Sequence, residues 1–470
     1  MIRSLVVVAL LVAACDSEPK PPPPPSIEVI GHNDLLARGM NAAPAIIGNH
    51  MYIGSRTDSE FHDNSGVLIV DISDPTSPMV VGEIGEPDEA LIGMTSRELR
   101  AVPDKNLLIV MNFSCSPDIH DCSRPLILFP ETGGVAETDN FKFYDVSDPT
   151  SPQLITTYDF GSSPRNPEVS PHEFHLWRDP NDPDRVLLYV ATPLGPPAMQ
   201  VLDISDLNNI DVVATFDPED DAGLEEPRGI AGALLHSVSV SADGRTGFIS
   251  YETAGMMIIN TSELADNIAN PQIRMLTPVN KRIDYSPPFP DGTHSAVELP
   301  GRPFVILTDE VYPAPAFPGC PWGWARIVDY SNPQEPFIAG EYKVEENDPA
   351  GCTSPEGGPD FVTATAHNTT ATENIALISW HSAGLEIVDV SDAVNPTRLL
   401  RFRPTSVGTV ATEDPALGGD PVLMWSYPII KDGLIYVVDV RNGLYILRYD
   451  GPYASEINDA AFIEGNSNLR

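Results

Sequence analysis

The stretch Val67-Leu-Ile-Val-Asp-Ile-Ser-Asp-Pro-Thr-Ser-Pro78 decides the fold, because closely similar stretches return along the chain. Residues 141–152 and 385–392 repeat it clearly, and weaker copies begin at Met199, Met256, Ala325 and Leu444. The copies recur about every 60 residues, and a fixed period of this size indicates a repeat architecture. Seven copies of one unit favour a closed ring.

Each copy joins a short run of β-branched and aromatic residues to an Asp-x-Ser-Asp-Pro turn, after which a second apolar run begins, as in residues 79–84. This pattern predicts a β-hairpin. The Asp and Ser side chains can bond backbone amides, and the proline presets φ, so the turn is encoded locally. Upstream lies another strand pair, for example residues 235–241 and 247–251. Four short antiparallel strands per repeat predict an all-β protein built of propeller blades.

The repeats resemble those of the LVIVD-repeat family of bacterial β-propellers, at Leu68-Ile-Val-Asp71 and Glu386-Ile-Val-Asp389. Residues 375–384 and 441–452 are similar to segments of that family as well. The resemblance spans residues 28–450 and implies a seven-bladed β-propeller, which we place at residues 26–455. It implies little about chemistry, because one propeller scaffold hosts many unrelated functions.

The ring needs a strand to complete its last blade. The seventh copy ends near Tyr449, and no good fourth strand follows it. The segment Ser26-Ile-Glu-Val-Ile-Gly31 precedes the first full blade, and pairing it with the last blade would cover an exposed sheet edge. We therefore predict that an N-terminal strand closes the propeller and that residues 456–470 form a polar tail.

The N-terminus predicts export. Residues 1–14 hold one arginine and an apolar run, which is typical of a signal peptide and too short to span a membrane. The ending Leu11-Val-Ala-Ala-Cys15 resembles a bacterial lipobox, in which the chain is cut before the cysteine and that residue is acylated, for example with palmitate. An ordinary signal peptide followed by a free cysteine is the alternative.

Residues 15–25 would then form the lipidated cysteine and a proline-rich linker, since Pro21 to Pro25 favour a stiff polyproline II spacer. These features predict a cell-envelope lipoprotein, with a membrane anchor at Cys15, on the periplasmic side or the cell surface.

The charge of the chain limits its partners. Lys and Arg number 27, Asp and Glu number 67, and the formal net charge is −40. Nucleic acid is therefore not an expected partner. An acidic, soluble surface explains the charge most simply, and we expect a monomer. Calcium is a cofactor candidate for acidic loops such as residues 217–221, although none matches an EF-hand.

Four cysteines follow Cys15, an even number that predicts two disulfides in an exported protein. Cys115 and Cys122 enclose a short loop, which leaves Cys320 and Cys352 as the second pair. The other connectivities stay open. A cysteine-rich metal site is the alternative, but no Cys-x-x-Cys spacing supports it.

Alignment of the first strand of each blade brings histidines to one equivalent position. The equivalent residues are Asn41, Arg97, His172, His236, His294, His367 and Trp425. Four successive blades thus carry histidine at the rim where the loops between second and third strands also lie. Those loops supply Glu252, Asp309, Glu310 and His381.

Neutral imidazoles suit iron, copper or zinc, and a ligating ring usually needs a second acceptor such as Glu252 or Glu310. In architecture the arrangement is similar to carotenoid oxygenases, propellers whose iron is held by four histidines, although their sequence motifs are absent here. The leading hypothesis is a binding module with a His-rich rim pocket for a small ligand, a metal or an envelope protein. The alternative is a metal-dependent oxidoreductase with a four-histidine axial metal site. A third interpretation is structural, with the imidazoles bonded to the backbone of a neighbouring blade.

Overall fold

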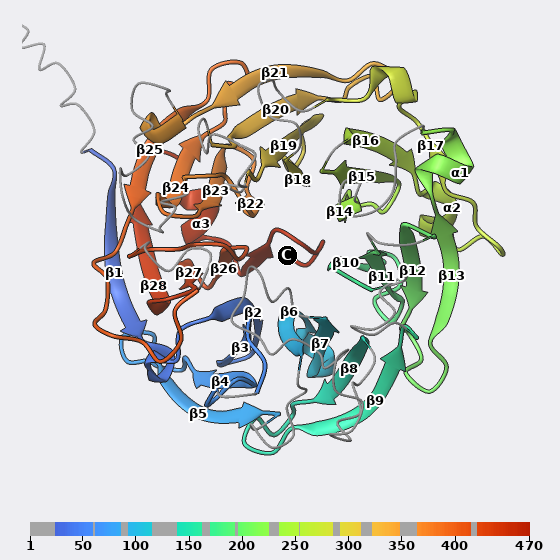
Figure 1. The fold of residues 1–470 in the computed structure, drawn as a ribbon. Helices are drawn as coiled ribbons and strands as arrows, with labels where there is room; N and C mark the ends of the chain where they lie inside the picture. The colour runs from blue at the N-terminus through green and yellow to red at the C-terminus, as the bar shows by residue number, and fades with distance from the viewer. Residues whose placement is uncertain are drawn as a thin grey trace, which may run out of the picture.

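The computed structural model shows seven antiparallel sheets around a central axis (Figure 1), which confirms the seven-bladed β-propeller. It describes residues 24–59, 62–85, 93–114, 139–161, 170–192, 196–224, 235–252, 254–284, 292–311, 322–347, 364–414 and 421–470. The predicted signal peptide, Cys15 and the cysteines Cys115, Cys122, Cys320 and Cys352 lie outside the described residues. Within the described ranges, no helix is both long and apolar enough to cross a membrane.

The first six blades are four-stranded, and their strands follow one another from the axis outward. Blade 1 comprises β2 (Asn41–Ile47), β3 (His50–Ser55), β4 (Val67–Asp71) and β5 (Met79–Ile84). Blade 2 comprises β6 (Met94–Val102), β7 (Leu107–Ser114), β8 (Asn140–Asp145) and β9 (Gln153–Asp159). Blade 3 comprises β10 (Glu173–Arg178), β11 (Val186–Ala191), β12 (Met199–Asp203) and β13 (Asp211–Phe216).

The second half of the ring repeats this order. Blade 4 comprises β14 (Leu235–Val240), β15 (Thr246–Tyr251), β16 (Gly255–Asn260) and β17 (Arg274–Met275). Blade 5 comprises β18 (Thr293–Glu298), β19 (Phe304–Asp309), β20 (Ala325–Asp329) and β21 (Phe337–Tyr342). Blade 6 comprises β22 (Thr369–Ala371), β23 (Ile375–Trp380), β24 (Gly384–Asp389) and β25 (Thr397–Phe402). Blade 7 comprises β26 (Ile429–Lys431), β27 (Leu434–Asp439), β28 (Gly443–Asp450), β1 (Ser26–Asn33) and β29 (Phe462–Glu464).

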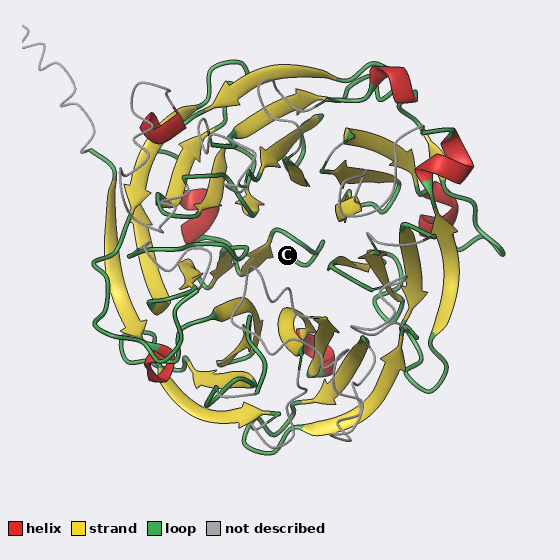
Figure 2. Cartoon of the chain, in the orientation of Figure 1, coloured by secondary structure: helices red, strands yellow, loops and turns green. Residues whose placement is uncertain are grey.

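The helices are short and connect strands (Figure 2). They are α1 (Pro218–Ala222), α2 (Ser262–Ala265) and α3 (Ser455–Asn458), with 3-10 turns at η1 (Leu35–Ala37), η2 (Pro103–Lys105), η3 (Val279–Lys281) and η4 (Glu345–Asn347). In α1, the side chain of Asp217 accepts a hydrogen bond from the Glu219 backbone N–H at 3.0 Å. Asp217, in the acidic segment considered for calcium, thus serves as a helix cap.

The repeated motif forms the third strand and the turn to the outermost strand. The Asp71 carboxylate accepts from the Ser73 backbone N–H at 2.8 Å, and Asp74 accepts from Thr76 at 3.0 Å. The same two bonds recur in blade 2 with the same lengths. Aspartates that bond the amide two residues ahead fix a turn by themselves, so the sequence alone determines this hairpin.

The hydrophobic core lies between the faces of neighbouring blades. Phe141 of blade 2 meets Phe174 of blade 3 edge to face, with ring centroids 4.8 Å apart, and both are fully buried. Each sheet is therefore covered on both faces, which explains why the motif strand is a continuous apolar run instead of an alternating one. A ring of such contacts leaves the inner strand ends free to present polar side chains.

The N-terminal strand closes the ring, as predicted. β1 pairs antiparallel with β28 from Ser26 opposite Asp450 to Asn33 opposite Leu444. Asn33 also donates to the Pro78 carbonyl at 2.8 Å, which ties the closing strand to blade 1. The seventh blade is thus built from both ends of the chain, and β1 covers the outer edge of β28.

The prediction of a polar tail at residues 456–470 is wrong. Residues of β29 pair with β26, with Ile430 opposite Ile463. The chain then crosses to blade 3, where Leu176 donates to the Asn466 carbonyl at 3.1 Å and Arg178 donates to the Asn468 side chain at 2.7 Å. The C-terminus consequently lies near the axis (Figure 1). The short β26 has an inner edge that needs a partner, and the tail supplies one.

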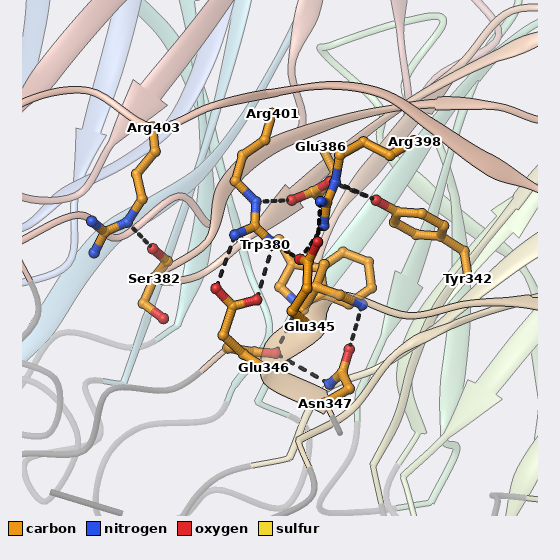
Figure 3. A network of polar contacts seen from close by, with 12 residues as sticks. Tyr342, Glu345, Glu346, Asn347, Trp380, Ser382, Glu386, Arg398, Arg401 and Arg403 are labelled. Atoms are coloured by element: carbon orange, nitrogen blue, oxygen red, sulfur yellow. Dashed lines mark hydrogen bonds and ion pairs between the residues drawn. The ribbon is translucent and has the colours of Figure 1, made fainter. Parts of the chain in front are cut away.

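A polar network joins the outer parts of blades 5 and 6 (Figure 3). The fully buried carboxylate of Glu386 accepts from Tyr342 at 2.6 Å and from Arg398 at 2.8 Å, and it also contacts Arg401. Arg398 forms a second, bidentate pair with Glu345 at 2.6 Å for each bond. A buried carboxylate needs such partners, and here they come from two adjacent blades.

Candidate metal centre

In blades 4 and 5, the predicted equivalent position coincides with an irregularity at the start of the inner strand. The pairing register shifts between Leu235 and Ser237 in β14 and between Thr293 and Ser295 in β18. The residues skipped are His236 and His294. A bulge of this kind takes a side chain out of the regular alternation and re-aims it.

The four predicted histidines come together, each ring against the next. Ring centroids lie 4.3 Å apart for His172 and His236, 4.0 Å for His236 and His294, and 3.9 Å for His294 and His367. His381, which directly follows β23, continues the series at 5.2 Å from His367. The first four imidazoles thus come from four successive blades, as the alignment predicts, and His381 comes from the same blade as His367.

Glu310 lies among these rings. Its carboxylate oxygens are 3.6 Å from His294 Nε2, 3.2 Å from His367 Nε2 and 3.0 Å from His381 Nε2. The side chains of these histidines are at most 1% exposed, and that of Glu310 is 7% exposed. Sequence reasoning gave Glu310 a supporting role, whereas the structure places it at the centre of the cluster.

Gly292 helps to position Glu310. Its backbone N–H donates to the Glu252 carbonyl at 2.9 Å, and its carbonyl accepts from the Glu310 N–H at 2.7 Å. Gly292 has φ +128°, and a Cβ there would lie 2.9 Å from the Glu310 carbonyl oxygen. Glycine therefore fits this junction, where the loops of blades 4 and 5 meet, better than any other residue.

The side chains form two groups of potential metal ligands that share Glu310. One group is His236, His294 and Glu310, and the other is Glu310, His367 and His381, which we together call the axial cluster. Within each group, the potential ligand atoms lie within 4.8 Å of one another. Ligand atoms that bind the same zinc ion, each at about 2.1 Å from it, must lie at such separations from one another.

His172 belongs to neither group. Its Nε2 lies 2.9 Å from His236 Nε2, and its Nδ1 lies 3.4 Å from an Arg97 nitrogen. The residues that the structure groups together thus differ from the predicted four histidines, because they include His381 and Glu310 and leave out His172.

Burial sets the protonation of the axial cluster. It lowers the pKa of His236 to about 3 and that of His367 to about 4, and it brings the pKa of His294 well below its usual value. Burial alone would raise the pKa of Glu310, but the contacts with His367, His381 and His294 outweigh it and the pKa falls well below its usual range. Neutral imidazoles at His236, His294 and His367 beside an ionised carboxylate are the protonation states that a metal requires.

The structure does not support a purely structural role for His294 and His367. Among the described residues, the Nδ1 atom of each histidine has no hydrogen-bond partner, and the Nε2 atom of each faces the Glu310 carboxylate. The expected bonds to the backbone of a neighbouring blade are therefore not made by these two rings. Buried polar nitrogens are normally satisfied, so this pair calls for an explanation.

Arg97 and Trp425, also at the equivalent position, lie beside the histidines. The Trp425 ring is 4.8 Å from the His367 ring, and the guanidinium of Arg56 lies 4.3 Å above Trp425. Arg97 stacks on Phe113 at 4.4 Å. These contacts support the histidines from the blade 7 and blade 2 sides.

The two remaining predicted carboxylates differ in their partners and in their exposure to solvent. Glu252 lies 4.0 Å from His236 Nε2, and its side chain is 34% exposed. Asp309 pairs with Arg326 of β20, and both side chains are fully buried. Successive residues at a strand end face opposite ways, so Glu310 joins the cluster and Asp309 does not.

Sequence reasoning missed Glu173, which directly follows His172. Its carboxylate lies 3.8 Å from His236 Nδ1 and accepts from the Tyr427 hydroxyl at 2.5 Å. Burial, followed by the nearby charge of Glu98, raises the pKa of Glu173 to about 8. The signal that could have revealed it is an acidic residue beside a histidine at the start of an inner strand.

Comparisons with known proteins agree with the repeat. The sequence profile of the LVIVD repeat matches residues 44–84, 135–160 and 365–403. No curated protein sequence matches the chain. Among solved structures, the chain is similar to the crystal structure of Chaetomium thermophilum Sqt1, with 14% identity and a TM-score of 0.48 over 89% of this chain and 86% of that chain. The three profile matches contain the motif strands β4, β8 and β24, which confirms the repeat found in the sequence.

Proposed function

For this seven-bladed β-propeller with LVIVD repeats, we propose the function of a metal-binding module of the bacterial cell envelope, with a divalent transition-metal ion held in the axial cluster. The observation that carries the proposal is the position of Glu310, whose oxygens lie 3.0 to 3.6 Å from the Nε2 atoms of three buried histidines. Imidazole and carboxylate ligands together suit zinc, iron or copper.

Electrostatics support a cation at this place. An ionised carboxylate among neutral imidazoles is a buried net negative charge, and burying a charge is costly unless it is paired. A divalent ion would neutralise Glu310 and would engage ring nitrogens of His294 and His367, which form no hydrogen bond to the backbone in the described part of the chain.

The exposed fractions of the side chains support an entry route for a cation on the side of His236 and Glu252. The side chain of His236 is 11% exposed and that of Glu252 is 34% exposed, whereas His294, His367 and His381 are nearly inaccessible. An arriving cation would therefore meet the Glu252 carboxylate first. A partly exposed acidic group beside the cluster favours capture of positively charged ions.

We expect the purified protein to retain zinc, iron or copper, and we expect His294→Ala to weaken metal affinity by at least about 100-fold, since even supporting residues cost 10- to 100-fold. The measurement is metal analysis followed by competition with a chelator of known affinity. His175→Ala is the matched control, because His175 is also a buried histidine of an inner strand but lines a small cavity with Glu464 and Asn468.

The metal-binding proposal fails if the wild-type chain retains no such ion and binds none after chelation and reconstitution. It also fails if His294→Ala and His175→Ala bind metal equally well while both variants remain folded by circular dichroism.

A metal-dependent oxidoreductase is the second candidate, and one observation favours it. Each ligand group supplies three protein ligands, the number that catalytic sites use while they keep a position open for water or substrate. The retained metal distinguishes the two functions. Iron or copper that changes oxidation state with a reductant supports the oxidoreductase, whereas zinc supports the binding module.

We also propose that Cys15 is lipidated and holds the propeller at a membrane through the linker at residues 15–25, which is supported by the sequence 1–25. Cys15→Ser is then expected to move the protein from the membrane fraction to the soluble fraction. Ser17→Ala is the control and should stay at the membrane. A Cys15→Ser protein that remains membrane-bound, or an N-terminal peptide without added lipid mass, would contradict the anchor.

A further inference from the structure

The two oxygens of Glu310 face different imidazoles. Oε2 lies 3.6 Å from His294 Nε2. Oε1 lies 3.2 Å from His367 Nε2 and 3.0 Å from His381 Nε2. One carboxylate therefore serves both groups of potential ligands, with a separate oxygen toward each.

The two groups have no histidine in common. His236 and His294 belong to the first, and His367 and His381 belong to the second. Each group, completed by Glu310, offers three ligand atoms, which suffices for one ion with open positions. A single ion would leave two of the four histidines without a role as ligands.

The two groups adjoin each other. The rings of His294 and His367, one from each group, have centroids 3.9 Å apart. In two-metal sites the ions are about 3.5 to 4 Å apart, and a shared carboxylate can span that gap. The carboxylates of Glu173 and Glu252, 3.8 and 4.0 Å from His236, add negative charge beside the first group.

We propose that the axial cluster is a dinuclear transition-metal centre bridged by Glu310. His236, His294 and Glu310 Oε2 hold the first ion, and His367, His381 and Glu310 Oε1 hold the second. His172, 2.9 Å from His236, orients the ring of that ligand. This inference rests on the proposed metal-binding function and deepens it, because it specifies two ions where the function requires only one.

The test is titration of the metal-free, full-length chain with Co²⁺, followed by visible absorption and by metal analysis. We expect two equivalents per chain for the wild type and for His175→Ala. His236→Ala and His381→Ala should each retain one equivalent, and Glu310→Ala should weaken both sites.

A second measurement does not depend on the variants. Loaded with Cu²⁺, the wild-type chain should show the magnetic coupling of two close ions in electron paramagnetic resonance, and His381→Ala should show an isolated ion. One equivalent in the wild type, or two equivalents without coupling, would overturn the bridged centre and leave the metal-binding function standing. No bound metal at all would overturn both.

Discussion

A chain that begins at Asp34, and so lacks β1, is expected to lose about 5 kcal/mol or more of its free energy of unfolding, which is much of the stability of a typical domain. The reason is the exposed edge of β28. Tyr445, Leu447 and Tyr449 of that strand are at most 5% exposed in the intact protein, and removal of β1 uncovers them. The measurement is thermal unfolding by circular dichroism, together with size-exclusion chromatography.

In the chain that begins at Asp34, the propeller also loses specific contacts that β1 makes. His32 stacks on Tyr445 with centroids 4.3 Å apart and contacts the Asn442 carbonyl at 2.8 Å. A chain that begins at Ser26 keeps all eight residues of β1 and is the matched control. Equal melting temperatures for the two chains would show that β1 does not stabilise the closure of the propeller.

Arg326→Met is expected to lower the free energy of unfolding by about 3 to 5 kcal/mol, the usual effect of removing one partner of a buried ion pair. The side chains of Arg326 and Asp309 are both 0% exposed, so water cannot replace the lost guanidinium. Because Asp309 directly precedes Glu310, the same variant is expected to disturb the axial cluster. Chemical denaturation gives the stability, and Co²⁺ titration gives the effect on metal binding.

Two further variants test this explanation. The double variant Asp309→Leu with Arg326→Met removes both charges and should recover most of the lost stability. Arg274→Met breaks the ion pair with Glu263, in which the Arg274 side chain is 58% exposed. This substitution should change the free energy of unfolding by about 1 kcal/mol or less. A comparable loss in Arg274→Met and Arg326→Met would mean that burial is not the cause.

The repeat unit could be predicted from the sequence because its signals are local. Asp71 and Asp74 each bond an amide two residues ahead, so the turn needs no other part of the chain. The fixed period then aligned the inner strands and placed His172, His236, His294 and His367 at equivalent positions. In the structure, each of these rings contacts the next.

The composition of the axial cluster could not be predicted in the same way. Asp309 and Glu310 are neighbours of similar chemistry, and only the direction in which each side chain leaves the strand end separates an ion pair with Arg326 from a place among the histidines. The bulge at His236 likewise depends on its pairing with the adjacent strand. The order of the potential ligands therefore follows from strand geometry and blade packing.

The sequence by itself determined the blades, their number and the N-terminal closing strand, because turns and apolar runs act over a few residues and repeat. Only the tertiary structure decided that residues 462–464 form an inner strand and that Glu310 lies between histidines of different blades. The physical reason is that these contacts join segments far apart in the chain. They form only when the ring has closed and the blades hold the inner strand ends together around one axis.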